Sequence, residues 1–393
     1  MIPEFFFSST PHIHFGSGKR SMLTELAGRF GKKMVLVTGD SSFDSSGRCQ
    51  QLWQELSRNF EIRRVRVSGE PSPQLVDKAV AEHHNFSADC VVAIGGGSAV
   101  DAGKAIAGLL PGGESVMEYL EGVGKGKAYA GPSTPLIAIP TTAGTGGETS
   151  RNAVLSVVGE KGFKKSFRHE ALVARYIILD PELTLDCPAE LTAACGMDAL
   201  TQLLESYVSS AANPMTDALA ISGLERVRDS LLTAVEDGDD INARTGMLYA
   251  SSLSGLTLAN AGLGSVHGLA SPLGALFPIP HGVVCGTLLF EATQINITAM
   301  YQRVPDHPSL EKYADAGRLF TRQASLDSYA AREALLGILQ AWSGRLMMPR
   351  LSRFGVSEED IDRIVAGSRG NSMQTNPVRL TDQEIAGIVR RRL

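Results

Sequence analysis

The fold of this chain is decided by residues 90–104, which read CVVAIGGGSAVDAGK. The first five residues form a continuous apolar run, typical of a β-strand that is buried on both faces. Three glycines follow, and Ser98 is placed to cap a helix that continues through Lys104. Bare glycines let the backbone approach a pyrophosphate closely, and a helix N-terminus offers it free N–H groups. The stretch therefore predicts a strand, a phosphate-binding loop and a helix.

This loop matches the dinucleotide-binding fingerprint G-x-G-x-x-G only in part, because Val100 occupies the third glycine position. A plain turn from strand to helix is therefore the alternative interpretation. Two roles also remain open for Asp101, which stands three residues after Ser98 and would either support the helix cap or belong to a functional site.

Similar apolar runs occur on both sides of this stretch, and helical patterns lie between them. The further strands are predicted at residues 34–38, 136–139 and 176–179, and the helices at 74–84 and 99–110. Val/Ile runs without polar alternation, joined by helices, favour a parallel sheet covered on both faces. The segment 108–135 is rich in glycine and proline and is predicted to be a loop.

The pattern changes after about residue 186, where strand signals nearly vanish. Apolar residues at helical spacing predict helices at 189–211, 214–236, 241–261, 308–320, 328–343 and 357–366. We therefore expect an α/β dinucleotide-binding domain with a parallel sheet over residues 1–185. An all-helical domain is expected over residues 186–393, with a hinge near residues 180–188.

Composition excludes several classes of protein. The 393 residues are 43% hydrophobic and carry a net charge of −5, which argues against a disordered chain and a nucleic-acid partner. The five cysteines form no C-x-x-C pair, which favours a reducing, cytoplasmic location over a disulfide framework. Met1–Phe7 lacks the pattern of a signal peptide, and no run of 18 apolar residues predicts a membrane span.

A second glycine-rich segment, IPTTAGTGGE at residues 139–148, follows the predicted third strand. Hydroxyl groups alternating with glycine suit contacts to ribose or phosphate, although an ordinary polar loop is the alternative. Its place at the carboxyl end of a strand, next to the first glycine loop, fits the crevice in which α/β sheets bind ligands.

Four dispersed residues form a candidate metal site. Asp198 and Gln202 are four residues apart on a predicted helix and therefore share one face. His267 and His281 both lie in glycine-rich surroundings. A carboxylate among apolar neighbours needs a cation or a strong donor, so the four could bind a divalent metal. Ordinary structural histidines are the alternative that spacing alone leaves open.

Together these stretches resemble the iron-containing alcohol dehydrogenase family. The most specific matches are GMDALT at 196–201 and PHG at 280–282. The other matching stretches, at 15–18, 69–73, 95–104, 140–148, 180–183, 267–274 and 376–377, run in family order over nearly the whole chain.

The resemblance implies a dehydroquinate synthase-like fold, a homodimer, NAD or NADP as cofactor, and hydride transfer between a small alcohol and its aldehyde or ketone. It implies a divalent metal on Asp198, Gln202, His267 and His281, with Fe²⁺ expected first and Zn²⁺ or Mn²⁺ as alternatives. The expected catalytic residues are Asp198, His267, His281 and Ser271. The expected cofactor-binding residues are Gly39, Asp40, Ser41, Gly96, Gly97, Ser98, Asp101, Thr141, Thr142, Thr145, Lys165 (with Lys164 as the alternative) and Leu183.

The chain departs from the family pattern at three positions. Gln202 stands where a histidine is usual, which puts the identity and affinity of the metal in question, because a neutral amide is a weaker ligand than imidazole. Ser271 replaces a common second histidine, so the proton would leave through water, the ribose hydroxyls or Ser271. Gly39 replaces an acidic residue of many NAD-preferring relatives, which favours tolerance of the NADP 2′-phosphate, although Asp40 follows directly and could favour either cofactor.

Two alternative functions follow from these departures. One is a metal-independent enzyme similar to the maleylacetate reductases, and the other is a nucleotide-binding protein that has lost catalysis.

Overall fold

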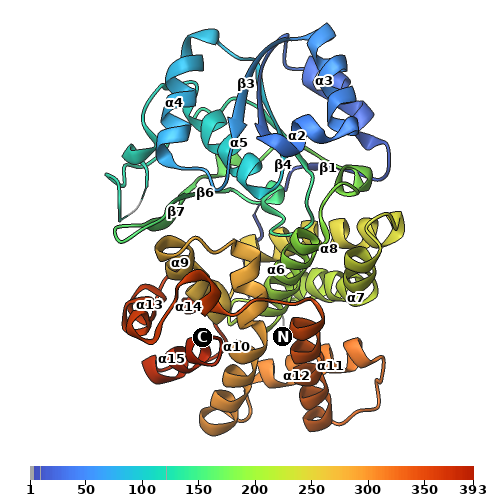
Figure 1. Ribbon diagram of the computed structural model, residues 1–393, viewed down its shortest axis with the longest axis vertical. Coiled ribbons are helices and arrows are strands. Elements are labelled where there is room, and N and C mark those ends of the chain that lie inside the picture. Colours follow the sequence, from blue (N-terminus) through green and yellow to red (C-terminus); the bar gives the residue numbers. More distant parts are fainter. Residues whose placement is uncertain (1–3, 9, 121) are drawn as a thin grey trace.

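The computed structural model describes residues 4–8, 10–120 and 122–393. Residues 1–3, part of the N-terminal stretch considered above, and residue 121, inside the predicted loop, lie outside the described residues. The strands all precede residue 180, and the long helices follow residue 188. Figure 1 shows the sheet-containing half above the helical half, with the chain passing from one to the other after the last strand.

Within the described residues, the main sheet has six parallel strands in the order β1-β8-β5-β4-β2-β3. The strands are β1 His12–Phe15, β2 Lys33–Gly39, β3 Glu61–Val67, β4 Cys90–Gly95, β5 Leu136–Pro140 and β8 Tyr176–Leu179. The four strands predicted from apolar runs are the inner ones, β8, β5, β4 and β2. The predicted parallel sheet is therefore confirmed.

The strands that the apolar runs did not predict lie at edges or outside the main sheet. Strand β3 reads EIRRVRV and mixes charged with apolar residues, because it is an edge strand whose Glu61, Arg63 and Arg66 are exposed. Two further strands, β6 Asn152–Val157 and β7 Phe163–Arg168, form a separate antiparallel hairpin. Strand β7 reads FKKSFR and lacks the apolar run of a buried strand.

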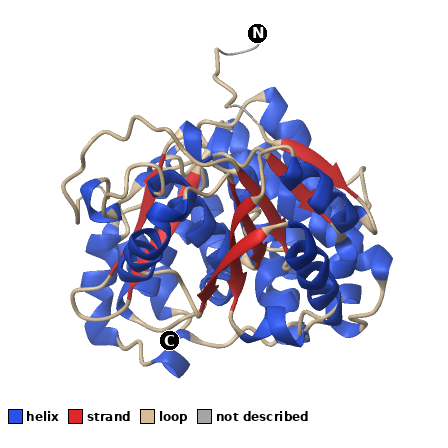
Figure 2. Ribbon diagram, turned by 90° about the horizontal axis from the view of Figure 1, so that it is seen from above, coloured by secondary structure: helices blue, strands red, loops and turns tan. Residues whose placement is uncertain are grey.

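Helices cover both faces of the sheet, as Figure 2 shows. Alternate residues of β2 enter different cores, with Val35 and Val37 facing one side and Met34 and Leu36 facing the other. One face is covered by α4 Pro73–His83 and α5 Gly97–Leu109, and the other by α1 Leu23–Gly28, α2 Ser41–Ser45 and α3 Gly47–Asn59. The predicted crossover helices correspond to α4 and α5.

The predicted cap of the glycine-loop helix is wrong. Helix α5 begins at Gly97, so Gly96 is its N-cap and Ser98 already lies in the first turn. Among the described residues, no side chain caps this terminus, which also removes a capping role for Asp101. The first N–H groups of α5 therefore remain free to bind a ligand.

The helical half follows the predicted ranges closely in its first three helices. It comprises α6 Ala189–Val208, α7 Pro214–Glu236, α8 Ile241–Ala261, α9 Ser265–Leu276, α10 His281–Arg303, α11 Pro308–Thr321, α12 Ser328–Arg345, α13 Ile361–Gly367, α14 Asn371–Gln374 and α15 Asp382–Arg390. The apolar spacing did not predict α9 or α10, because both are buried around most of their circumference and show no polar face. Helix α9 also contains Pro272.

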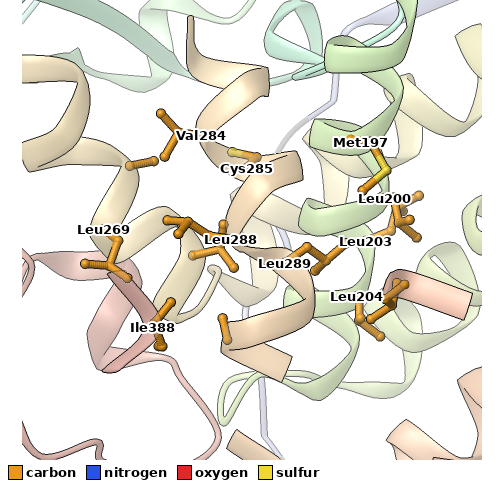
Figure 3. Packing of buried hydrophobic residues seen from close by; sticks show 14 of the residues in the cluster. Met197, Leu200, Leu203, Leu204, Leu269, Val284, Cys285, Leu288, Leu289 and Ile388 are labelled. Atoms are coloured by element: carbon orange, nitrogen blue, oxygen red, sulfur yellow. The ribbon is translucent and has the colours of Figure 1, made fainter. Parts of the chain in front are cut away.

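Helix α10 packs against α6 at the centre of this half. Figure 3 shows Met197, Leu200, Leu203 and Leu204 of α6 beside the side chains of α10, including Cys285. By length and composition alone α10 could cross a membrane, but 72% of its apolar window is buried inside the structure, as in a core helix of a soluble protein. This packing brings the N-terminal turn of α10 next to the middle of α6.

The contact between α5 and β4 depends on Gly103. A Cβ atom at this position would lie 2.6 Å from the Cβ of Ala93. We therefore expect Gly103→Ala to lower the free energy of unfolding by about 1–3 kcal/mol, because helix and strand would have to separate. Chemical denaturation followed by circular dichroism measures this change.

Gly337, inside α12, provides the matched control, since a Cβ there would meet no described atom within 4 Å. Gly337→Ala should leave stability unchanged or raise it by about 0.4–1 kcal/mol. Equal destabilisation by both substitutions would contradict the close-packing argument.

Candidate active site

A cleft of about 1430 Å³ separates the carboxyl ends of the parallel strands from the helical half. The ends of β2, β4 and β5 line one wall, and residues of α6, α9 and α10 line the other. The cleft is larger than a pocket for one small ligand, which is about 300–1000 Å³. It has room for a dinucleotide together with a small substrate.

The glycine loop forms the part of the cleft that suits a pyrophosphate. Gly95 has a φ of +157°, which favours glycine, and Gly96 is extended before α5 begins. A Cβ at Gly96 would lie 3.4 Å from Thr142 Oγ1, inside the space between the two glycine-rich loops. The loops therefore leave an open backbone surface at a helix N-terminus, where phosphate groups bind.

Most of the expected cofactor-binding residues come together at this cleft. Those that line it are Gly39, Gly96, Gly97, Ser98, Asp101, Thr141, Thr142, Thr145 and Leu183. Asp40, Ser41 and Lys165 are not among its lining residues, whereas Ser42 and Lys164 are. Side chains alternate along β7, so Lys164 faces the cleft and Lys165 is exposed on the other side. Lys164 Nζ lies 2.5 Å from Glu70 Oε1.

The Thr/Gly loop is held against the helical half by close backbone contact. A Cβ at Gly146 would lie 2.0 Å from the carbonyl oxygen of Ser251 in α8, and one at Gly255 would lie 2.0 Å from the carbonyl oxygen of Gly146. Ser251 Oγ also donates a hydrogen bond of 3.0 Å to the Gly144 carbonyl. The same loop also contacts α6, because Thr145 Oγ1 donates a hydrogen bond of 2.9 Å to Asp198 Oδ2.

Asp198, His267 and His281 meet at the bottom of the cleft. Asp198 Oδ1 lies 3.3 Å from His267 Nε2 and 3.7 Å from His281 Nε2. Burial alone would raise the pKa of Asp198, but His281 and His267 hold that pKa well below its usual range. Burial lowers the pKa of His281 to about 4. A carboxylate beside two imidazoles is a donor set that fits a divalent cation, which binds the rings in their neutral form.

Two more side chains adjoin these three. Gln202 Nε2 lies 3.4 Å from Asp198 Oδ1, while its buried Oε1 has no hydrogen-bond partner in the described part of the chain. Cys285 was missed by the sequence analysis, yet its Sγ lies 3.6 Å from His267 Nε2. One ligand atom from each of Asp198, His267, His281 and Cys285 falls within 4.8 Å of the others. The i, i+4 spacing of His281 and Cys285 was the available signal.

Glu205 is a second residue that sequence reasoning missed. Its Oε2 lies 2.7 Å from His267 Nδ1, and its Oε1 accepts a 2.7 Å hydrogen bond from the Val266 N–H. A carboxylate on one ring nitrogen orients the imidazole and leaves Nε2 to face Asp198. Glu205 is seven residues after Asp198 on α6, so the two side chains share a helix face.

Comparison with known proteins decides the family. Residues 10–181 match the sequence model of iron-containing alcohol dehydrogenase, and residues 192–393 match that of the C-terminal part of the Fe-containing alcohol dehydrogenase family. The chain belongs to the iron-containing alcohol dehydrogenase family. It is therefore an oxidoreductase that interconverts alcohols and aldehydes.

Similar proteins extend over the full length of this alcohol dehydrogenase. It is 35% identical to 1,3-propanediol dehydrogenase of Klebsiella pneumoniae over 392 residues, 97% of each chain. It is 32% identical to NAD-dependent methanol dehydrogenase of Bacillus methanolicus over 374 residues, 93% of each chain. A crystal structure of 1,3-propanediol oxidoreductase covers 100% of both chains with a TM-score of 0.90 and 31% identity. The predicted α/β half followed by a helical half is thus confirmed.

A buried charge cluster lies beneath the glycine loops of this alcohol dehydrogenase. The fully buried Lys104 donates hydrogen bonds to the carbonyls of Gly147 and Asn152 and to Ser150 Oγ. Burial raises the pKa of Asp101 to about 6 and that of Glu148 to about 7. Glu148 Oε1 has no hydrogen-bond partner within the described ranges. The ammonium group of Lys104 therefore ties α5 to the Thr/Gly loop and the residues after it. The carboxyl group of Glu148, in contrast, is costly to ionise.

The raised pKa of Glu148 predicts a pH-dependent stability. The folded state binds a proton that the unfolded chain, with a pKa of about 4.3, releases. The stability of the wild type should therefore fall as the pH rises from about 4.3 through 7, and Glu148→Gln should remove part of this loss. At pH 8 the variant should melt higher by on the order of 2–4 °C in differential scanning fluorimetry.

Glu333→Gln, on the exposed face of α12, serves as the control and should melt like the wild type at each pH. If Glu148→Gln and the wild type lose the same amount of thermal stability between pH 5 and pH 8, the burial argument is wrong.

Proposed function

We propose that this alcohol dehydrogenase uses a divalent metal on Asp198, His267 and His281 and either NAD or NADP in the glycine-loop part of the cleft. The observation that carries the proposal is the meeting of both sets of residues in one cleft, joined by the 2.9 Å hydrogen bond between Thr145 and Asp198. Gln202, the fourth ligand expected from the resemblance, adjoins the same carboxylate. The substrate is a small alcohol or its aldehyde.

The residues of the chain have separate roles in this proposal. Thr145 fixes one oxygen of Asp198, and Glu205 fixes the ring of His267. The free N–H groups of α5 and the open backbone of Gly95–Gly97 hold the pyrophosphate. Once bound, the metal would lower the pKa of the alcohol and the nicotinamide would accept the hydride. Positioning is therefore the main contribution of the protein.

The route for the alcohol proton passes through the open side of the cleft. Ser271 is exposed on the cleft wall, and its Oγ donates a 3.5 Å hydrogen bond to the carbonyl of Lys164. Water, the ribose hydroxyls and Ser271 are the groups that we propose for this transfer. Lys164 faces the cleft and Lys165 does not, so Lys164 is the lysine proposed to contact the cofactor.

Removal of the metal tests this function directly. A chelator-treated, metal-free sample should lose at least about 100-fold in kcat/KM for alcohol oxidation, because metal assistance supplies several kcal/mol of charge stabilisation. Adding a divalent metal back should restore the rate, and unchanged circular dichroism should show that the fold survived.

Two outcomes would contradict the proposal. Full activity without metal would favour an enzyme similar to the maleylacetate reductases. Cofactor binding without turnover of any alcohol or aldehyde in a substrate panel would favour a nucleotide-binding protein that has lost catalysis.

The choice between NAD and NADP is proposed to depend on Gly39. This residue ends β2 and lines the cleft together with Ser42, so no carboxylate stands at Gly39 to repel a 2′-phosphate. A Cβ at Gly39 would lie 2.6 Å from Ser42 Oγ, a side-chain atom that can rotate away.

Gly39→Asp should therefore lower kcat/KM with NADP by about tenfold or more, since like charges about 4 Å apart repel by roughly 1–4 kcal/mol. Activity with NAD should change much less. Gly39→Ala controls for the added Cβ and should affect both cofactors equally. A wild type that rejects NADP altogether would overturn this part of the proposal.

We further propose a cytoplasmic homodimer. Phe5, Phe6 and Ile13, on and before β1, are exposed apolar side chains of the kind that a second copy would cover. The cysteines all lie in the described part of the chain and are free, which supports a reducing compartment. Light scattering of the purified protein would establish the oligomeric state.

A further inference from the structure

We propose that the thiolate of Cys285, rather than the amide of Gln202, is the fourth metal ligand of this chain, and that it makes the centre a zinc site. The inference rests on the metal of the proposed function and assigns one residue and one element within it. It arises from two side chains of α10, His281 and Cys285, which lie one turn apart and face the same point.

Four of the six distances between the candidate ligand atoms are close to the edges of a tetrahedron around zinc, and all six are within 4.8 Å. Zinc bonds of about 2.0–2.1 Å to nitrogen or oxygen and 2.3 Å to sulfur imply edges of about 3.3 Å between N and O atoms and about 3.6 Å between N and S atoms. The distances from Asp198 Oδ1 to His267 Nε2 and His281 Nε2 are 3.3 and 3.7 Å. Those from Cys285 Sγ to the same nitrogens are 3.6 and 3.9 Å.

Gln202 presents the wrong atom to the same point. Its Nε2 lies 3.4 Å from Asp198 Oδ1 and serves as a hydrogen-bond donor to that carboxylate. An amide NH₂ group has no lone pair for a cation. Gln202 could bind only after its amide turned over, and Asp198 would then lose this donor. The unpartnered Oε1 makes the turned amide the competing arrangement, which the experiment below must distinguish.

The packing of α6 against α10 explains how a cysteine reaches the site. Cys285 belongs to the same buried cluster as Met197, one residue before Asp198, and Figure 3 shows both at the interface of the two helices. A cysteine that only filled the core would face apolar side chains. Cys285 instead directs its sulfur toward two imidazole nitrogens. In this assignment the fourth ligand comes from α10, at Cys285, and not from α6, at Gln202.

A thiolate changes which metal the site prefers. Sulfur ligands favour soft and borderline ions, and a set of one thiolate, two imidazoles and one carboxylate suits Zn²⁺ better than Fe²⁺. On binding, the bond from sulfur to the metal forms, the S–H bond breaks, and the proton passes to solvent, so the oxidation state of the metal is unchanged.

Cobalt substitution tests this ligand set without relying on turnover. Metal-free protein titrated with Co²⁺ should develop the intense near-ultraviolet absorption of a sulfur-to-cobalt charge transfer, together with the visible bands of tetrahedral Co²⁺. Cys285→Ser should lose the charge-transfer band. It should also bind Zn²⁺ at least about 100-fold more weakly, as measured by competition with a chromophoric chelator. Loss of a residue that only supports a metal ligand already weakens metal binding by about 10–100-fold, and loss of a ligand should cost at least as much.

Two further variants make the assignment specific. Cys195→Ser removes another cysteine that lines the same cleft and should keep the band. Gln202→Leu should also keep the band and weaken Zn²⁺ binding by less than about tenfold. Circular dichroism of each metal-free variant establishes that its fold is intact, and a misfolded Cys285→Ser would leave the wild-type cobalt spectrum as the deciding measurement.

The possible failures point to different conclusions. Tight Co²⁺ binding without a charge-transfer band in the wild type, or a band that survives in Cys285→Ser, would overturn the cysteine ligand while leaving the proposed metal enzyme intact. Loss of Zn²⁺ binding in Gln202→Leu alone would assign the fourth position to the turned amide. A wild type that binds neither metal would overturn both this inference and the proposed function.

Discussion

The burial of the Asp198 carboxylate between tightly packed helices is the constraint on which the rest of the structure depends. A charge that is 2% exposed costs several kcal/mol unless opposite charge or donors surround it. Thr145 approaches it from the sheet-containing half, and His267 and His281 approach it from the helical half. The same carboxylate therefore draws both walls of the cleft to one point, and the cofactor loops and the metal centre become neighbours because of it.

The strands that the sequence predicted share one pattern of burial. Strands β2, β4, β5 and β8 are continuous apolar runs because they are covered on both faces. The edge strand β3 and the hairpin strand β7 carry charged residues at exposed positions and gave no such run. Helices α9 and α10 were missed for the opposite reason, since they are buried on nearly all sides.

The candidate site was predictable in its residue types but less so in its geometry. Family motifs indicated Asp198, His267 and His281, and the structure brings these three together. Which of two adjacent lysines faces the cleft depends on the phase of β7, and the polar sequence of that strand does not reveal it. Cys285 and Glu205 resemble ordinary core residues in the sequence. Their roles emerge only from the register between α6, α9 and α10.

The contact of Gly146 with α8 has a consequence for motion. Because backbone touches backbone there, with no side chain between that could change rotamer, the two halves cannot slide past each other at this point. Any widening of the cleft is therefore expected to leave this contact in place, and with it the adjoining hydrogen bond from Thr145 to Asp198.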